Sequence, residues 1–150
     1  MYERVNPDQN LGTYAAQVVE TLLRDMAFAL HKTLNSPNGE NIHDLRTLCL
    51  RLRHSLRLFA KLFPQKPARK IRRRLCSLQD LLAEVRTCDV AREVLAIEGI
   101  ASAVGRDRKK LGSALDAERR SALRPLRVRL RKMQRSDSLQ RWRTRLLAAS

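Results

Sequence analysis

A row of basic side chains follows one face of the segment spanning residues 43 to 61. His43, Arg46, Arg53, Arg57 and Lys61 are separated by three, seven, four and four residues. With about 100° of rotation per residue, this spacing gathers them on one side of a helix, nearly opposite an apolar stripe. Such a row suits a long anionic partner, although a charged helix face is often simply solvated.

A second basic row occurs later in the chain. Arg120, Arg124, Arg127, Arg131 and Arg135 are separated by four, three, four and four residues, again opposite apolar positions. The planar fork of donors on arginine forms bidentate contacts with phosphate oxygens, so phosphate is the favoured ligand group. We expect the two rows to hold successive phosphates from facing helices. The alternative is that the second row only keeps the protein soluble.

The composition favours a polyanionic partner. Lysine and arginine number 31 against 15 acidic residues, which gives a formal charge of +16 over 150 residues. Self-repulsion of this size destabilises a compact fold unless counter-ions or a polyanion lie close by. Charge alone does not distinguish RNA or DNA from other phosphate polymers. Aromatic residues make up only 4% of the chain, however, which leaves few platforms for stacking bases.

Few residues could carry catalysis. Phosphoryl transfer usually needs carboxylates that hold magnesium, or a glycine-rich phosphate loop. The chain contains no G-x-x-x-x-G-K-S/T pattern, and Glu84, Asp89 and Glu93 do not form an evident two-metal site. His43 and His54 would lie about 16 Å apart along a helix, so they cannot share a metal ion. We expect no enzyme activity, no metal and no cofactor.

Cysteine usage and hydropathy indicate the cellular compartment. Cys49, Cys76 and Cys88 lack the C-x-x-C spacing of common metal sites and are expected to be reduced residues in or near the core. No segment reaches the roughly 20 apolar residues of a membrane span, and the N-terminus lacks a basic-then-apolar signal pattern. These features predict a cytoplasmic protein with no membrane partner.

Long helices must position the basic rows, and apolar residues recur at helical spacing almost throughout the chain. A first helix is expected over residues 12–34, before a cluster of turn formers. A second helix should begin near Asn41, which could cap it with Asp44 answering three residues later. It should run to Phe63 and break at Pro64.

A third helix is expected after Pro67 and through Val85, followed by a separate short helical piece that Thr87 or Asp89 could cap and that reaches Leu95.

The remaining residues predict a long fourth helix and a C-terminal helix. The fourth should begin after Gly99 or Gly105 and kink at Pro125, and the last should begin at residues 136–137. The predicted fold is therefore all-α: an antiparallel up-and-down bundle of four long helices plus short helical segments. We expect residues 1–150 to form a single domain.

Two segments carry a recognisable pattern. The first contains Ile42, His43, Asp44, Leu45 and Arg46, followed by Arg51, Leu52, Arg53, Leu56 and Phe59. The second contains Leu78, Gln79, Leu82, Arg86, Asp89 and Val90. The first segment resembles the motif V-H-x-x-R-V-x-x-R-R-x-R of the CHAD (conserved histidine α-helical domain) family, and the second resembles that family's later motif, L-Q-x-x-L-G-x-x-R-D-x-D-V.

The resemblance implies a non-catalytic helical module that binds inorganic polyphosphate in a basic pore or groove, in the cytoplasm and at polyphosphate granules. His43 stands at the motif histidine, a residue that outside such a motif is usually an ordinary hydrogen-bonding group. The expected polyphosphate-binding residues are His43, Arg46, Arg51, Arg53, Arg57, Lys61, Arg73, Arg86, Arg120, Arg124, Arg127 and Arg131.

The chain also departs from the family pattern. Leu50 occupies a position where the family usually has arginine, and Cys76 stands where a basic residue is common. Ala83 replaces the motif glycine, and Thr87 replaces the first motif aspartate. Leu50 therefore interrupts the basic row.

Length and chemistry leave several questions open. A typical family member contains two related bundles, whereas this chain has room for one, so a homodimer would restore the missing wall. Arg86 could face phosphate or form a local pair with Asp89. Two different binding functions compete with the one that the resemblance implies: RNA or DNA binding, and a scaffold module that docks an acidic protein.

Overall fold

The computed structural model describes residues 10–148, and every regular element in that range is helical. The elements are α1 (Leu11–Asn35), α2 (Gly39–Leu58), the short 3-10 helix η1 (Ala60–Leu62), α3 (Gln65–Leu95), α4 (Glu98–Val104), the 3-10 helix η2 (Gly105–Asp107), α5 (Arg108–Arg135) and α6 (Ser138–Leu147). The all-α prediction is confirmed.

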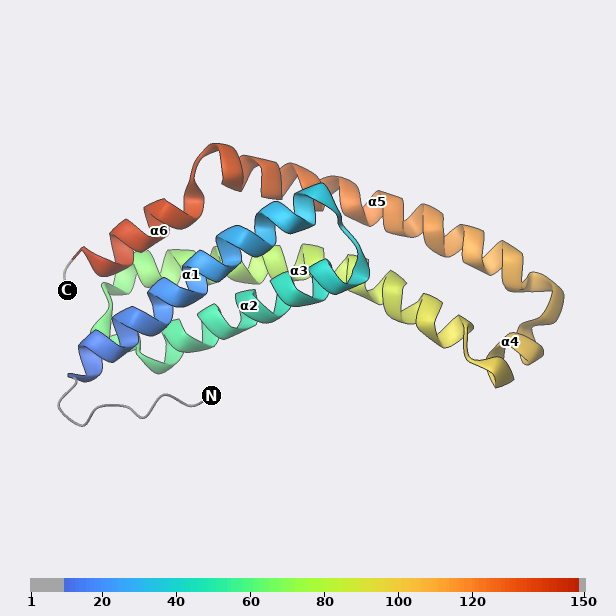
Figure 1. Cartoon of the computed structure of the whole chain (residues 1–150), viewed down its shortest axis with the longest axis horizontal. Coiled ribbons are helices and arrows are strands. Elements are labelled where there is room, and N and C mark those ends of the chain that lie inside the picture. Colours follow the sequence, from blue (N-terminus) through green and yellow to red (C-terminus); the bar gives the residue numbers. More distant parts are fainter. Residues whose placement is uncertain (1–9, 149–150) are drawn as a thin grey trace.

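The four long helices, α1, α2, α3 and α5, run up and down, and α6 returns along the bundle (Figure 1). α2 packs between α1 and α3, α5 packs against α3, and α6 packs against α1 and α3. Their apolar stripes form one core, which includes Met26, Leu45, Leu52, Leu75, Leu82, Leu126 and Trp142. Burial of these stripes fixes which face of each helix is left to solvent.

The start of α2 differs from the prediction. Asn38, not Asn41, is the N-cap, because it has an extended backbone and its side chain accepts a 2.9 Å hydrogen bond from the Asn41 amide. The Asn41 side chain instead donates to the Ser36 carbonyl at 2.7 Å. The helix therefore begins two residues earlier than expected and closes a short link to α1.

The end of α2 also differs, because the helix ends at Leu58 and not at Phe63. The turn of η1 follows, and Phe63 then adopts extended backbone angles and is buried. Pro64 explains this conformation, since the residue before a proline is disfavoured in the helical region. Lys61 thus lies in η1 and not on α2.

A single long helix, α3, replaces the expected break near Thr87 and Asp89. The Thr87 hydroxyl donates to the Ala83 carbonyl one turn earlier at 2.9 Å. The Asp89 carboxylate pairs with Arg119 of α5. Neither side chain is therefore available to cap a new helix, and the backbone ladder continues through both.

The far ends of α3 and α5 extend past α1 and α2 as an antiparallel hairpin closed by α4 and η2 (Figure 1). No residue of α4 is buried, and several apolar side chains at this end are exposed, including Val94, Ile97 and Leu111. Gly105 adopts a positive φ of 56° at the turn into α5, a conformation that a residue without Cβ adopts freely. α5 then continues through Pro125.

Within residues 10–148, no helix combines the length and apolar character that a membrane crossing requires.

Cys49 and Cys88 are buried, Cys76 is half-buried, and all three are free thiols, which confirms their expected place in or near the core.

Candidate anion-binding surfaces

Burial of one side of α2 turns its basic row outward. Ile42, Leu45, Cys49, Leu52 and Leu56 are fully buried, which leaves the opposite side of the helix to solvent. As expected from the helical spacing, His43, Arg46, Arg57 and Lys61 are exposed on or just beyond α2. Arg51, which the family resemblance singled out, is also exposed.

One flank of this row meets α3. Arg53 is half-buried, and its Nη1 donates a 2.9 Å hydrogen bond to Oε1 of Gln79. Arg46 lies seven residues before Arg53, and Arg86 lies seven residues after Gln79. The two helices are antiparallel (Figure 1), so seven residues back along α2 and seven residues forward along α3 both move about 10.5 Å in the same direction. Arg46 and Arg86 therefore lie at the same height along the helix pair.

Basic side chains of α2 and α3 together form one surface, the α2–α3 face. It comprises Arg46, Arg53 and Arg57 of α2 together with Arg72, Gln79 and Arg86 of α3, which recur on one side of their helices. Arg72 is a residue that the sequence reasoning missed. Its Nε is buried and has no hydrogen-bond partner among the described residues, so an anion could contact it only after the side chain moves.

Two of the four departures from the family pattern, Leu50 and Ala83, lie at the same level of this helix pair. Leu50 is 39% exposed and lies one turn from Arg53, while Ala83 lies one turn from Gln79 in the matching direction. An apolar gap therefore separates the level of Arg53 from the level of Arg46.

Arg86 does not pair with Asp89, so the local pair considered for these two residues is wrong. Arg86 lies 3.6 Å from Glu93, further along α3. Asp89 instead accepts a 2.6 Å bond from Nε of Arg119, whose Nη2 also donates to the Pro37 carbonyl at 2.6 Å. The second motif thus supplies Gln79 and Arg86 to the α2–α3 face, and Asp89 to a structural contact among α3, α5 and the α1–α2 link.

The other flank of the α2 row meets α1 and has a different charge. His43 and Arg51 line a pocket of about 460 Å³ between the two helices, which also contains Lys32, Asp25 and Asp44. The two carboxylates offset much of the positive potential there. The structure therefore places His43 and Arg51 on the α1 side of the row and Arg53 on the α3 side.

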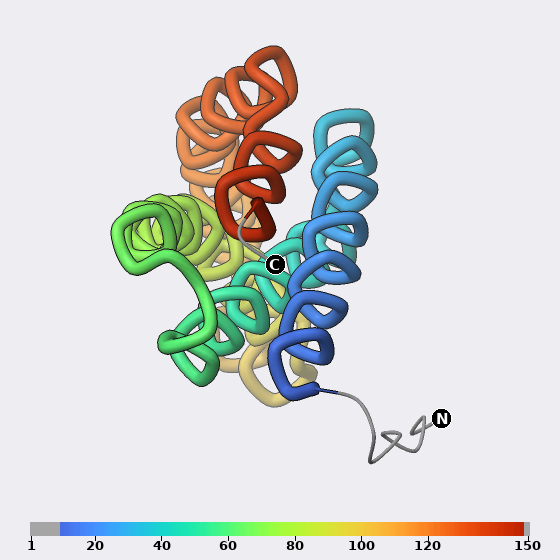
Figure 2. The backbone as a smooth tube through the Cα atoms, turned by 90° about the vertical axis from the view of Figure 1, so that its left-hand side faces the viewer, coloured from blue at the N-terminus to red at the C-terminus, as the bar shows by residue number. Residues whose placement is uncertain are grey.

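The α5 row does not face the α2 row. Arg120, Arg124, Arg127 and Arg131 are exposed on a helix that packs against α3, α1 and α6, whereas α2 packs against α1 and α3. Figures 1 and 2 show α2 and α5 on opposite sides of the bundle. The expectation that these rows grip one ligand from facing helices of the same chain is wrong, because α3 lies between them.

Arg73 lies on a third surface. It turns away from Gln79 along α3 and lines a pocket of about 460 Å³ shared with α5 and α6. Arg74, Arg129, Lys132 and Arg141 line the same pocket, and the sequence reasoning missed all four. No single helical row contains them, so only the packing of three helices reveals the cluster.

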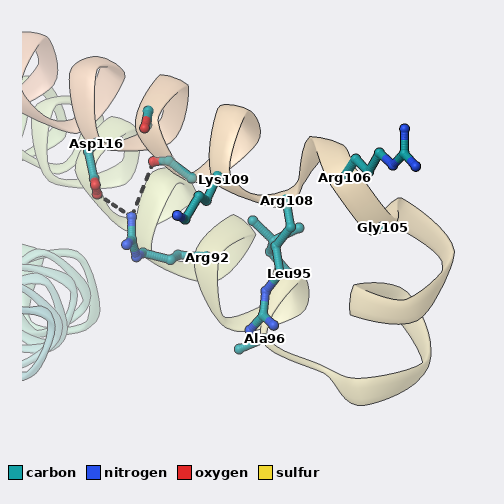
Figure 3. A pocket seen from close by; sticks show the side chains of 10 residues that line it. Arg92, Leu95, Ala96, Gly105, Arg106, Arg108, Lys109 and Asp116 are labelled. Carbon is teal, nitrogen blue, oxygen red and sulfur yellow. Dashed lines mark hydrogen bonds and ion pairs between the residues drawn. The ribbon is translucent and has the colours of Figure 1, made fainter.

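A further pocket, of about 680 Å³, lies near the hairpin tip between α3, η2 and α5 (Figure 3). Arg92 forms an ion pair with Asp116 across it and also donates to the Gly112 carbonyl at 3.3 Å, while the Arg106 side chain points away from it. Asp116 neutralises Arg92, but Arg108 and Lys109 also line this pocket and form no ion pair with another described residue, so its net charge stays positive.

Two buried thiols are unsuited to thiolate chemistry. Burial raises the pKa of Cys49 to about 12. The pKa of Cys88 is raised first by burial and then by the nearby charges of Glu118 and Asp89. Both thiols stay protonated near neutral pH, so neither is an activated nucleophile.

Most of the positive charge has no carboxylate partner. Among residues 10–148, four ion pairs are formed: Arg86–Glu93, Arg92–Asp116, Arg119–Asp89 and Arg143–Glu20. The fold and these surfaces define an all-α, strongly basic bundle whose surface potential attracts anions.

A model of the CHAD domain matches residues 14–150. The chain belongs to the CHAD family, whose domains are associated with polyphosphate binding. No curated protein and no solved structure matches it significantly.

Proposed function

We propose that this protein binds inorganic polyphosphate non-catalytically along the α2–α3 face. The observation that carries the proposal is the Arg53–Gln79 hydrogen bond, which joins the two family motifs in one basic surface. Arg72, which is half-buried on α3, adds a further positive charge to this surface.

Binding would follow from replacement of counter-ions by guanidinium groups. Arg46, Arg53 and Arg57 form no ion pair with another described residue, so their charge is available to a ligand. Each phosphate neutralised releases bound cations, which makes the affinity fall steeply with salt. Gln79 holds the Arg53 side chain in place and reduces the entropy lost on binding.

The test is a charge-matched comparison with long-chain polyphosphate. The double variant Arg53→Gln/Arg57→Gln should weaken binding about tenfold or more and flatten its dependence on salt. The control Arg24→Gln/Lys110→Gln removes the same charge from exposed positions on α1 and near the tip. Equal affinities in the two double variants would remove the α2–α3 face from the site.

RNA or DNA is the main competing ligand, since it also rewards rows of arginine. Aromatic residues are scarce and Trp142 is only 2% exposed, so among the described residues Phe28 of α1, which is 67% exposed, is the main platform on which a base could stack. Long polyphosphate should displace bound nucleic acid at equal phosphate concentration, and nucleic acid should displace polyphosphate poorly. The opposite order would favour a nucleic-acid binder.

An enzyme and a scaffold module can each be tested directly. Release of orthophosphate from polyphosphate in the presence of magnesium would show an enzyme. An acidic protein partner that stays bound after Arg53 and Arg57 are neutralised would support a scaffold module.

Cytoplasmic residence at polyphosphate granules is part of the proposal, and co-localisation of a tagged chain with granules checks it.

A second copy of the chain could supply the wall opposite the α2 row. Two identical basic faces repel each other, so a twofold dimer should form only when a polyanion lies between them. Light scattering should therefore show a monomer alone and a dimer with polyphosphate. A monomer under both conditions would contradict dimerisation without affecting binding to a single α2–α3 face.

A further inference from the structure

The pocket between α3, α5 and α6 concentrates positive charge more tightly than either helix row. Five basic side chains line its volume of about 460 Å³, namely Arg73, Arg74, Arg129, Lys132 and Arg141. No carboxylate lines it, and none of the five forms an ion pair with another residue in the range 10–148. Asp137, in the adjoining turn, lines a different pocket with Glu20.

The walls of this pocket suit an anion. Trp142 and Met133 contribute a floor that is almost fully buried, and low-polarity surroundings strengthen the attraction between an anion and the basic side chains. The hydroxyls of Ser77, Ser136 and Ser138 also line it; the Ser136 hydroxyl donates to the Lys132 carbonyl at 2.7 Å, which leaves Ser138 to donate to Ser136. Ser136 and Ser138 lie 2.9 Å apart through their Oγ atoms, so they form one polar edge.

The shape of the pocket limits the size of the ligand. Three helices enclose it, and its volume falls within the range of roughly 300–1,000 Å³ that holds small molecules. The α2–α3 face, in contrast, is an open surface along two helices. A compact anion with several negative charges would engage basic groups from all three walls at once, whereas a single phosphate would leave several of them unpaired.

We propose that the α3/α5/α6 pocket is a second site, which binds a short oligophosphate of about three phosphates. Guanidinium groups from α3, α5 and α6 surround the phosphates, and the Ser77 hydroxyl adds a further hydrogen-bond donor. The ligand has two chemical sources, a free oligophosphate or the end of a longer polyphosphate chain. The site is separate from the α2–α3 face and does not depend on it.

The experiment measures binding of inorganic tripolyphosphate by calorimetry to the full chain and three charge-matched variants. Arg129→Gln/Arg141→Gln, which removes one cation from α5 and one from α6, should weaken tripolyphosphate binding about tenfold or more. Arg53→Gln/Arg57→Gln and the control Arg24→Gln/Lys110→Gln should each change it less than threefold. If tripolyphosphate binding weakens equally in all three variants, or does not weaken in Arg129→Gln/Arg141→Gln, the pocket is not the oligophosphate site.

Two further measurements test whether the variants still fold and which source of oligophosphate the pocket binds. Arg57 and Arg141 are exposed and Arg53 and Arg129 are half-buried, so each variant is also melted; a melting temperature within a few degrees of the parent shows that lost binding is not lost structure. Long-chain polyphosphate, which has far fewer ends per phosphate, should compete with tripolyphosphate poorly at equal phosphate concentration. Equal competition would overturn the preference for a short ligand, while loss of long-chain binding only in Arg53→Gln/Arg57→Gln would keep the two sites distinct.

Discussion

Leu50 is the residue at which the α2 row departs most clearly from its own pattern. It is 39% exposed between the levels of Arg46 and Arg53, where a basic side chain would continue the row. An exposed leucine here contributes little to the core, so the position is free to accept charge.

Leu50→Arg should increase the affinity for long polyphosphate. One added phosphate contact should strengthen binding about three- to tenfold at low salt and steepen the logarithmic salt dependence by about 0.7–0.9. Val128→Arg is the control, because it adds the same charge at an exposed position of α5. Titrations over a series of salt concentrations compare the two variants, and an equal gain in both would show that only net charge matters.

Cys49 links a single thiol to the pH dependence of stability. Burial raises its folded pKa to about 12 from the ordinary thiol value of 9.0, so folding favours the protonated thiol. Its contribution is complete below pH 9 and is lost as the pH rises toward 12. The free energy of unfolding should fall by about 1 kcal/mol between pH 8 and pH 10 on this account alone.

Guanidinium unfolding at the two pH values measures this fall. Cys49→Ala will be less stable overall, but its fall between pH 8 and pH 10 should be smaller by about 1 kcal/mol. An identical fall in the parent and in the variant would contradict the assignment.

Under native conditions at pH 8, half-buried Cys76 should react with iodoacetamide before Cys49 or Cys88.

At the scale of elements, Arg119 of α5 connects its own helix to α3 and to the link between α1 and α2. It bonds Asp89 of α3 and the Pro37 carbonyl from its own position on α5, and the side chains of the ion pair are only 23% and 15% exposed. Removing the arginine would leave a half-buried carboxylate and a carbonyl without their partner.

Arg119→Ala should therefore reduce stability by about 2 kcal/mol. Arg120→Ala changes the neighbouring exposed residue and should cost less than about 0.5 kcal/mol. Urea unfolding gives both values. Arg119→Lys should recover only part of the loss, since one ammonium group does not reproduce the arginine fork. Equal losses at positions 119 and 120 would show that the contact contributes nothing.

The helices could be predicted because their apolar spacing is local information. Their boundaries could not, since these depend on which of several side chains takes each role. Asn38 and Asn41 are both good caps, and only the packed α1–α2 link decides between them. Asp89 could start a new helix in isolation, but Arg119, distant in sequence, engages its carboxylate.

The same distinction applies to the candidate sites. A row on one helix, such as Arg46, Arg53 and Arg57, follows from periodicity alone. The two flanks of α2 differ in charge because α1 contributes Asp25 whereas α3 contributes Gln79. The spacing of residues within one helix does not show which helices will pack against it, so this difference could not be predicted. The α3/α5/α6 pocket was missed for the same reason, since each helix supplies only one or two of its cations.

The whole molecule carries a formal charge of +16, and only four ion pairs are formed among residues 10–148. Its cations lie on several sides, on the α2–α3 face, the α5 row and the α3/α5/α6 pocket. Repulsion among them opposes folding at low salt and weakens as the screening length falls from about 10 Å at 0.1 M to about 3 Å at 1 M.

The melting temperature should therefore rise with sodium chloride, by about 3–6 °C between 0.05 and 0.5 M if about 1–2 kcal/mol of repulsion is screened. Arg124→Gln/Arg127→Gln reduces the repulsion along α5 and should flatten this rise. Long polyphosphate at low salt should raise the melting temperature further, because it binds the folded bundle in preference to the unfolded chain, and that increment should disappear at 0.5 M salt. Calorimetric scans separate the two effects. A melting temperature that falls with salt would mean that attractive ion pairs, and not repulsion, dominate the electrostatics of the bundle.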